Sequence, residues 1–224
     1  MGINIKLLRA LASQSNGKHP ISKFVERDQT INELYQEARR SGMKESLMHQ
    51  MRLNTVVSYV TILEVFLKGT VIWNAGLWNR DGIDKLMKEN ISMRDAFELI
   101  RTPNIKEEHI ILQTQNFQNV NAIVYVFTTL LGRDFVKAMA ETRKLYVQGF
   151  LTGTAPESWQ SMLNECLETR HKIVHEGLQE LTDEQVSTYA NTVFGFGVSV
   201  DLLLMKEYDF EKYRELEQLV TGKN

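Results

Sequence analysis

The sequence predicts an all-α protein, and three of its features carry that prediction. Its 224 residues include only three prolines and thirteen glycines, too few for the turns of a β-sandwich or for a disordered linker. Hydrophobic residues make up 43% of the chain, which is enough to fill a core. Several long segments also repeat apolar residues at the three- and four-residue spacing of helices. We therefore expect an up-and-down helical bundle with extra short helices.

The first part of the chain predicts a peripheral segment followed by two helices. Residues 1–27 contain a short apolar stretch and a Gly-Lys-His-Pro turn. An amphipathic helix is expected from Asp28 to about Gly42, where serine and glycine end it. The longest helix is expected at 43–74, because its apolar residues keep to one face, namely Met51, Val56, Tyr59, Val60, Leu63, Phe66 and Leu67.

The middle of the chain predicts a loop and two short helices. Gly76 and Gly82 indicate a loop over 74–84. Small amphipathic helices are expected at 92–101 and 106–115.

A strongly apolar helix is expected next, at 120–131. It is interrupted by polar residues and falls short of the roughly 20 apolar residues that cross a bilayer, so it is interpreted as buried. Gly132 is expected to bend the chain before a further helix at 134–147.

Two capping signals frame the last long helices. Thr154-Ala-Pro-Glu157 is a helix start, and Gly177 suits the left-handed end of that helix, so we expect it over 156–175. Thr182-Asp-Glu-Gln185 is a capping box that opens a long apolar helix at 183–206.

The domain organisation expected from these elements is simple. Residues 1–224 form a single all-α domain whose core helices span about 43–206. Residues 1–27 are peripheral, and a charged helix closes the chain at 209–220.

Charge and cysteine content limit the classes of function. A net charge of −2 does not support a broad basic face for nucleic acid, so we expect any RNA contact to be local. Arg39, Arg40 and Lys44 could supply one, although small charge groups of this kind usually form solvated helix surface. The single cysteine, Cys166, cannot form an internal disulfide, and the N-terminus lacks a signal-peptide pattern. We expect a cytoplasmic protein without a membrane partner.

Arg170 occupies an apolar position of the helix expected at 156–175. The residues of its stripe are Trp159, Met162, Leu163, Cys166, Ile173 and Val174. A buried guanidinium is costly unless an anion pairs with it, and it is suited to bidentate contact with phosphate. His175 follows five positions later, about 140° around an ideal helix. The two side chains cooperate more easily if two chains contribute them, which predicts a dimer.

The segment Leu167-Glu-Thr-Arg-His-Lys-Ile-Val-His-Glu-Gly177 resembles the signature of HEPN proteins. That signature is an Arg and a His separated by four residues near a helix C-terminus, with a polar residue after the arginine, here His171. The resemblance implies a metal-independent endoribonuclease that acts as a homodimer with paired motifs across its interface. It also implies a toxin–antitoxin or antiviral defence role, with an inhibitor or antitoxin protein as a further partner. One toxin branch has a tyrosine where this chain has Gly177, so modification at that position is not expected.

The residue types suit RNA cleavage through the 2′-hydroxyl. A histidine titrates near neutral pH and can accept and donate protons, while arginine stabilises charge on the phosphorane-like transition state. We expect His175 to act as acid and base, Arg170 to hold phosphate, and His171 to orient RNA or the opposite histidine. Glu64 lies on an apolar stripe of the helix at 43–74 and is a candidate for orienting Arg170, although it could instead reach solvent. No cofactor or metal is expected.

Three alternatives stay open. His175 could serve only to cap the helix, and Arg170 could pair with a core carboxylate. His171 and His175 are four residues apart and could bind a metal as part of a hydrolase, but no neighbouring Cys or His completes a ligand set. The same surface could also belong to a catalytically inactive HEPN-like binding or adaptor module.

Overall fold

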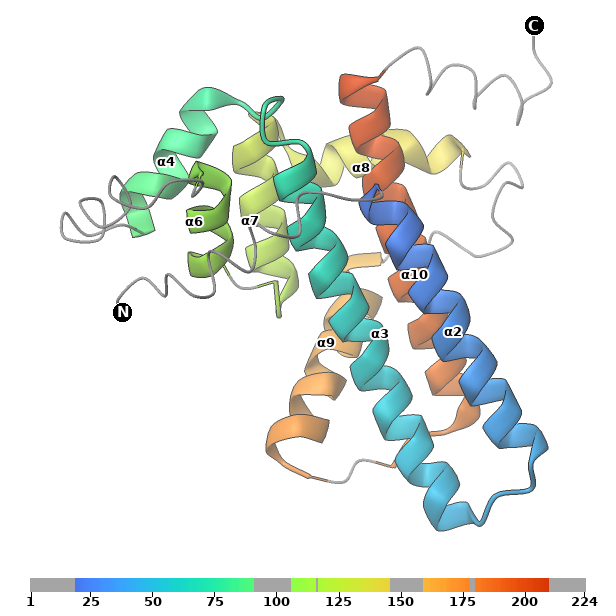
Figure 1. Cartoon of the computed structure of the whole chain (residues 1–224). Helices are drawn as coiled ribbons and strands as arrows, with labels where there is room; N and C mark the ends of the chain where they lie inside the picture. Colours follow the sequence, from blue (N-terminus) through green and yellow to red (C-terminus); the bar gives the residue numbers. More distant parts are fainter. Residues whose placement is uncertain (1–18, 91–105, 116, 146–158, 178–179, 210–224) are drawn as a thin grey trace, which may run out of the picture. The chain divides into compact units, whose positions relative to one another are not determined.

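The computed structural model describes residues 19–90, 106–115, 117–145, 159–177 and 180–209. These residues form helices and contain no strand, which confirms the all-α prediction for this part of the chain (Figure 1). The helices are α2 (Pro20–Arg40), α3 (Glu45–Trp73), α4 (Arg80–Asn90), α6 (Glu107–Thr114), α7 (Val120–Leu131), α8 (Phe135–Leu145), α9 (Trp159–His175) and α10 (Asp183–Tyr208).

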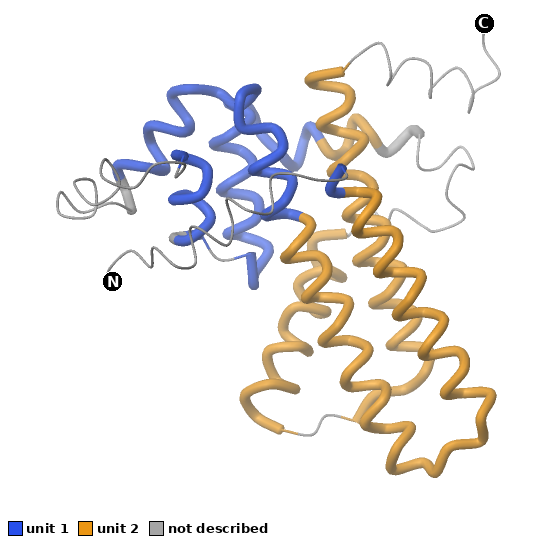
Figure 2. Tube along the Cα trace, viewed as in Figure 1, with its two compact units in different colours: residues 1–20, 67–138 blue, residues 21–66, 139–224 orange. Residues whose placement is uncertain are grey.

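The chain divides into two compact units, each built from two stretches of sequence (Figure 2). Unit 1 comprises residues 1–20 and 67–138, and unit 2 comprises residues 21–66 and 139–224. Helices α2, α3 and α8 each contribute residues to both units. The prediction of one domain over 1–224 stays a prediction.

Unit 1 has an aromatic core in which α4 packs against α6 and α7. The Phe127 ring stacks on that of Phe135 with centroids 5.2 Å apart, and Trp78 meets Phe127 edge-on. The Asn119 side chain accepts a hydrogen bond from the backbone N–H of Ala122, which caps α7. Gly132 ends that helix with a φ of 69°, so the predicted bend is confirmed.

Unit 2 contains α2 from Ile21 onward, most of α3 and α8, and all of α9 and α10. The aromatic ring of Phe24 on α2 packs against Phe66 on α3, with centroids 4.9 Å apart. A Cβ at Gly197 of α10 would lie 2.6 Å from the Phe24 ring, so this glycine allows α2 and α10 to approach closely. The Thr182 capping box is present at the start of α10, as predicted.

The helix bounds confirm most of the expected elements and correct two. The helices expected at 43–74, 106–115, 120–131 and 183–206 are α3, α6, α7 and α10. The first amphipathic helix begins at Pro20 rather than Asp28, because proline fits the first turn of a helix.

The loop expected over 74–84 is shorter than predicted. Helix α4 begins at Arg80, and Gly82 lies inside it rather than in a loop. The expected helix at 92–101, the Thr154 start signal and the short stretch before residue 19 lie outside the described residues. The same holds for the helix expected at 209–220, of which only Asp209 is described.

Two described helices, α3 and α10, are long and apolar enough to cross a membrane by length and composition alone. More than half of each apolar window is buried inside the protein, 61% for α3 and 56% for α10. The core helices of a globular domain have the same character.

Candidate functional site

The candidate site lies on α9 in unit 2, so the packing of α9 against its neighbours determines the positions of the site residues. Leu163, Cys166 and Leu167 bury one face of α9. The helix ends at His175, and Gly177 follows with a φ of 96°, in the left-handed region that favours glycine. The predicted helix end is therefore confirmed.

Helix α9 packs along α10, and the contact includes both apolar and polar groups. The Trp159 ring stacks on Phe196 with centroids 5.0 Å apart. The hydroxyl of buried Tyr189 donates a hydrogen bond to Glu165 Oε1 at 2.9 Å and lies 3.2 Å from the hydroxyl of Thr169. Burial raises the pKa of Tyr189, so it stays a neutral hydrogen-bond donor. These contacts hold α9 against α10 up to Thr169, the residue before Arg170.

The one cysteine of this helix is not a candidate nucleophile. Cys166 is fully buried, and burial raises the pKa of its thiol to about 12. A thiol in such surroundings is protonated at neutral pH and poorly nucleophilic.

Arg170 is half-buried, as its position on the apolar stripe predicts. Its Nε is inaccessible to solvent and has no hydrogen-bond partner. No carboxylate among the described residues forms an ion pair with it, so the alternative in which a core carboxylate neutralises Arg170 is not seen in this part of the chain. An unsatisfied charged donor is energetically costly and is suited to an incoming anion.

Glu64 on α3 is also half-buried, and its Oε1 is buried without a hydrogen-bond partner. The structure shows neither a hydrogen bond nor an ion pair between Glu64 and Arg170, although both residues belong to unit 2. The predicted direct contact is therefore absent. A contact through water stays a prediction.

The structure brings His171 and His175 together. Both side chains are exposed, and their ring centroids are 4.5 Å apart with the planes tilted by 44°. Arg170 does not share their surroundings, because it is half-buried whereas His175 is exposed. This difference agrees with the separation of about 140° that five helical residues produce.

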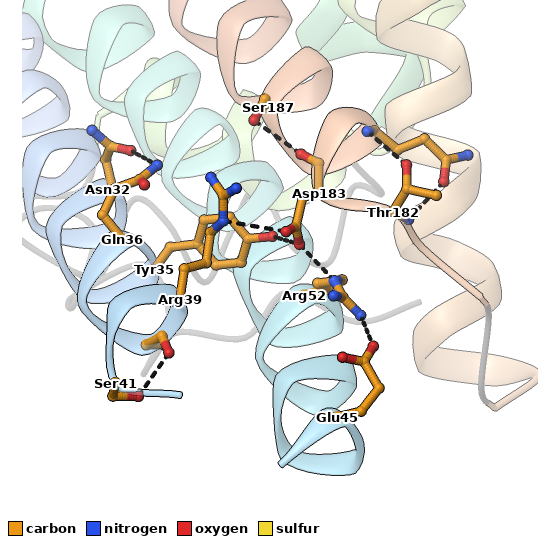
Figure 3. Close-up of polar contacts among 12 residues, drawn as sticks. Asn32, Tyr35, Gln36, Arg39, Ser41, Glu45, Arg52, Thr182, Asp183 and Ser187 are labelled. Carbon is orange, nitrogen blue, oxygen red and sulfur yellow. Dashed lines mark hydrogen bonds and ion pairs between the residues drawn. The ribbon is translucent and has the colours of Figure 1, made fainter. Parts of the chain in front are cut away.

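A polar cluster that we did not predict joins α2, α3 and α10 (Figure 3). Asp183 accepts hydrogen bonds from the Tyr35 hydroxyl and from Arg52 Nε, both at 2.7 Å. Arg39 also pairs with Asp183 at 3.2 Å, so this member of the basic group considered for RNA contact takes part in a structural ion pair. Arg52 pairs in addition with Glu45 at 2.6 Å.

Electrostatics agree with a structural role for this cluster. The hydrogen bonds from Arg52 and Tyr35 hold the pKa of Asp183 below its usual range. Burial, followed by the hydrogen bond to Asp183, raises the pKa of Tyr35 to about 12. At neutral pH the Asp183 carboxylate is therefore charged and the Tyr35 phenol is neutral. The sequence marked Asp183 only as part of a capping box.

Among the described residues, no group of three or more His, Cys, Asp or Glu side chains is placed to hold a metal ion. No family model, curated protein or solved structure matches the chain.

Proposed function

We propose that the chain is a HEPN-type endoribonuclease that cleaves RNA without a metal ion. The observation that supports this most is the presence, near one helix end, of a half-buried arginine with an unsatisfied Nε and of an exposed histidine. Arg170 has a buried Nε with no partner, and His175 lies exposed in the last turn of α9. These two residues are the Arg and His of the HEPN-like motif.

The chemistry assigned to these residues is transesterification within the RNA. His175 accepts the proton of a 2′-hydroxyl, whose oxygen attacks the adjacent phosphorus. Arg170 stabilises the negative charge on the phosphorane-like transition state. The bond to the 5′-oxygen breaks, and that oxygen takes a proton from a histidine. The products are a 2′,3′-cyclic phosphate and a 5′-hydroxyl, and the reaction needs no oxidant, water or metal ion.

Two copies of the chain form the active enzyme in this proposal. Arg170 and His175 are separated by about 140° around an ideal helix, so two chains bring them to one phosphate more easily than one chain does. A two-fold dimer would place the Arg170 of one copy near the His175 of the other. In this dimer His171 would orient the RNA or the histidine of the partner copy, and Glu64 would orient Arg170 through water.

The biological setting proposed is that of a toxin or antiviral effector in the cytoplasm, with an inhibitor protein as a further partner. This setting is supported by the motif resemblance alone.

The chemistry is tested by incubating the purified full chain with single-stranded RNA, with and without EDTA, and analysing the product ends. We expect EDTA-resistant cleavage that leaves 2′,3′-cyclic phosphates. Chelator-sensitive cleavage that leaves 3′-hydroxyl ends would instead indicate metal-activated water and contradict the proposal. No cleavage would favour the binding or adaptor module.

A further inference from the structure

The two exposed histidines of α9, His171 and His175, lie close together on the helix surface. His171 and His175 are four residues apart, so they lie on one face of the helix, and their ring centroids are 4.5 Å apart. Metal–nitrogen bonds of about 2.0–2.1 Å to two imidazoles place the ring centres about 4.5–5.2 Å apart when the nitrogen–metal–nitrogen angle is between about 90° and 109°. The observed spacing of 4.5 Å lies at the 90° end of this range.

The charges around the pair also favour a cation. The two rings lie near the C-terminal end of α9, where the helix dipole presents its negative end. Glu168 lies three residues before His171 on the same face and is exposed, and Glu176 follows His175 directly and is exposed as well. Lys172 and Arg170 are the opposing charges on this helix. Arg170 is half-buried on a different face from that of His175.

We propose that His171 and His175 together bind one divalent transition-metal ion, with Zn²⁺ as the reference ion. Imidazole nitrogen is a good ligand for Zn²⁺, Ni²⁺ and Cu²⁺, whereas Mg²⁺ prefers oxygen ligands. Water completes the coordination, because the described residues offer no third side chain placed to bind the ion.

Occupancy of this site has a consequence that rests on the proposed function. An imidazole nitrogen bound to a metal ion cannot accept or donate a proton, so a bound ion removes His175 from acid–base work. The ion would therefore inhibit an enzyme that needs no metal for its reaction. This property separates the site from that of a metal hydrolase, in which the same ion would activate cleavage.

Binding is tested first, without reference to activity. The tag-free full chain is titrated with ZnCl₂ by calorimetry, and the histidine ring signals are followed by NMR. Wild type and His49→Ala, which lacks a histidine outside the pair, should bind alike. His171→Ala and His175→Ala should each weaken binding by at least about tenfold, which is about 1.4 kcal/mol. MgCl₂ should not compete. Unchanged Zn²⁺ affinity in both pair variants would overturn the proposal.

Inhibition is tested second, on the RNA cleavage assay. Zn²⁺ should lower the rate of wild type and of His49→Ala, while any cleavage retained by His171→Ala should be insensitive to the same concentration. Activation of wild type by Zn²⁺ would contradict the inhibitory role. If Zn²⁺ binds through the pair but the chain cleaves no RNA, the metal site stands and the ribonuclease proposal falls.

Discussion

Asp183, the first residue of α10, accepts a hydrogen bond from Arg52 Nε on α3 at 2.7 Å, although the two residues are 131 positions apart in the sequence. The Tyr35 hydroxyl of α2 reaches the same carboxylate oxygen. One carboxylate thus links α2, α3 and α10 of unit 2. Helix α10 in turn packs against α9, which contains the candidate catalytic residues.

Asp183→Asn should destabilise the protein by about 1 to 3 kcal/mol at pH 7, because it weakens hydrogen bonds to a charged group. The pKa of Asp183 is depressed in the folded state, so its contribution is complete above the ordinary value of 3.8 and is lost as the pH falls through the folded value. Urea denaturation at several pH values measures both effects. Glu45→Gln is the control, since this partner of Arg52 is 76% exposed and should matter by less than about 1 kcal/mol.

His109 should make unit 1 sensitive to mild acid. Its ring is buried, Nδ1 accepts a hydrogen bond from the Lys106 N–H at 3.0 Å, and Nε2 has no hydrogen-bond partner. Burial lowers its pKa below the ordinary value of 6.5, so the folded state favours the neutral ring. Stability is therefore complete above pH 6.5 and falls as the pH drops below it, because the unfolded chain binds the proton first. His109→Asn, which keeps the acceptor, should flatten the pH dependence of denaturation between pH 7 and 5. An unchanged dependence would contradict this role.

Gly82→Ala should destabilise the packing of α4 against α7. A Cβ at this position would lie 1.9 Å from the backbone oxygen of Thr129, which cannot move without distorting α7. Overpacking of this kind costs about 1 to 3 kcal/mol, more than the gain of about 1 kcal/mol from replacing a helical glycine. Gly76→Ala is the matched control, because its Cβ would meet nothing within 4 Å. Equal melting temperatures for the two variants would disprove the close approach.

The sequence predicted the elements whose signals are local. The bounds of α7 match the predicted 120–131, and the Thr182 capping box and the Gly177 helix end are both present. Helix α4 was missed because Gly82 was interpreted as a loop residue. A glycine is needed at position 82 because the backbone of Thr129 leaves no room for a Cβ there. Thr129 is distant in the sequence, so no local pattern reveals this contact.

The same distinction applies to the site. The pairing of His171 with His175 follows from a four-residue spacing and could be read directly from the sequence. The half-burial of Arg170 followed from its stripe. The absence of a direct Glu64–Arg170 contact depends on how α3 and α9 pack, and the Asp183 cluster depends on three helices meeting, so neither could be inferred from spacing.

Mixing two inactive variants tests whether two copies share one active site. Arg170→Ala and His175→Ala should each be inactive alone. If each site takes Arg170 from one copy and His175 from the other, mixed dimers contain one intact site. An equal mixture, exchanged under mild denaturant, should then recover about a quarter of the wild-type rate. No recovery, with mixed dimers verified by mass, would place both residues of a site in a single chain.

The most direct measurement of the central claim is the RNA cleavage rate of His175→Ala and Arg170→Ala in the presence of EDTA. Both residues lie outside the buried apolar core, so circular dichroism should show folded proteins. We expect each rate to fall by about 10² to 10⁴, the usual contribution of acid–base catalysis, with a comparable loss for a preorganised phosphate contact. The controls His49→Ala and Arg27→Ala remove the same side-chain types elsewhere and should cleave as wild type does. Wild-type rates in folded His175→Ala and Arg170→Ala would contradict the assignment of the catalytic site to these two residues.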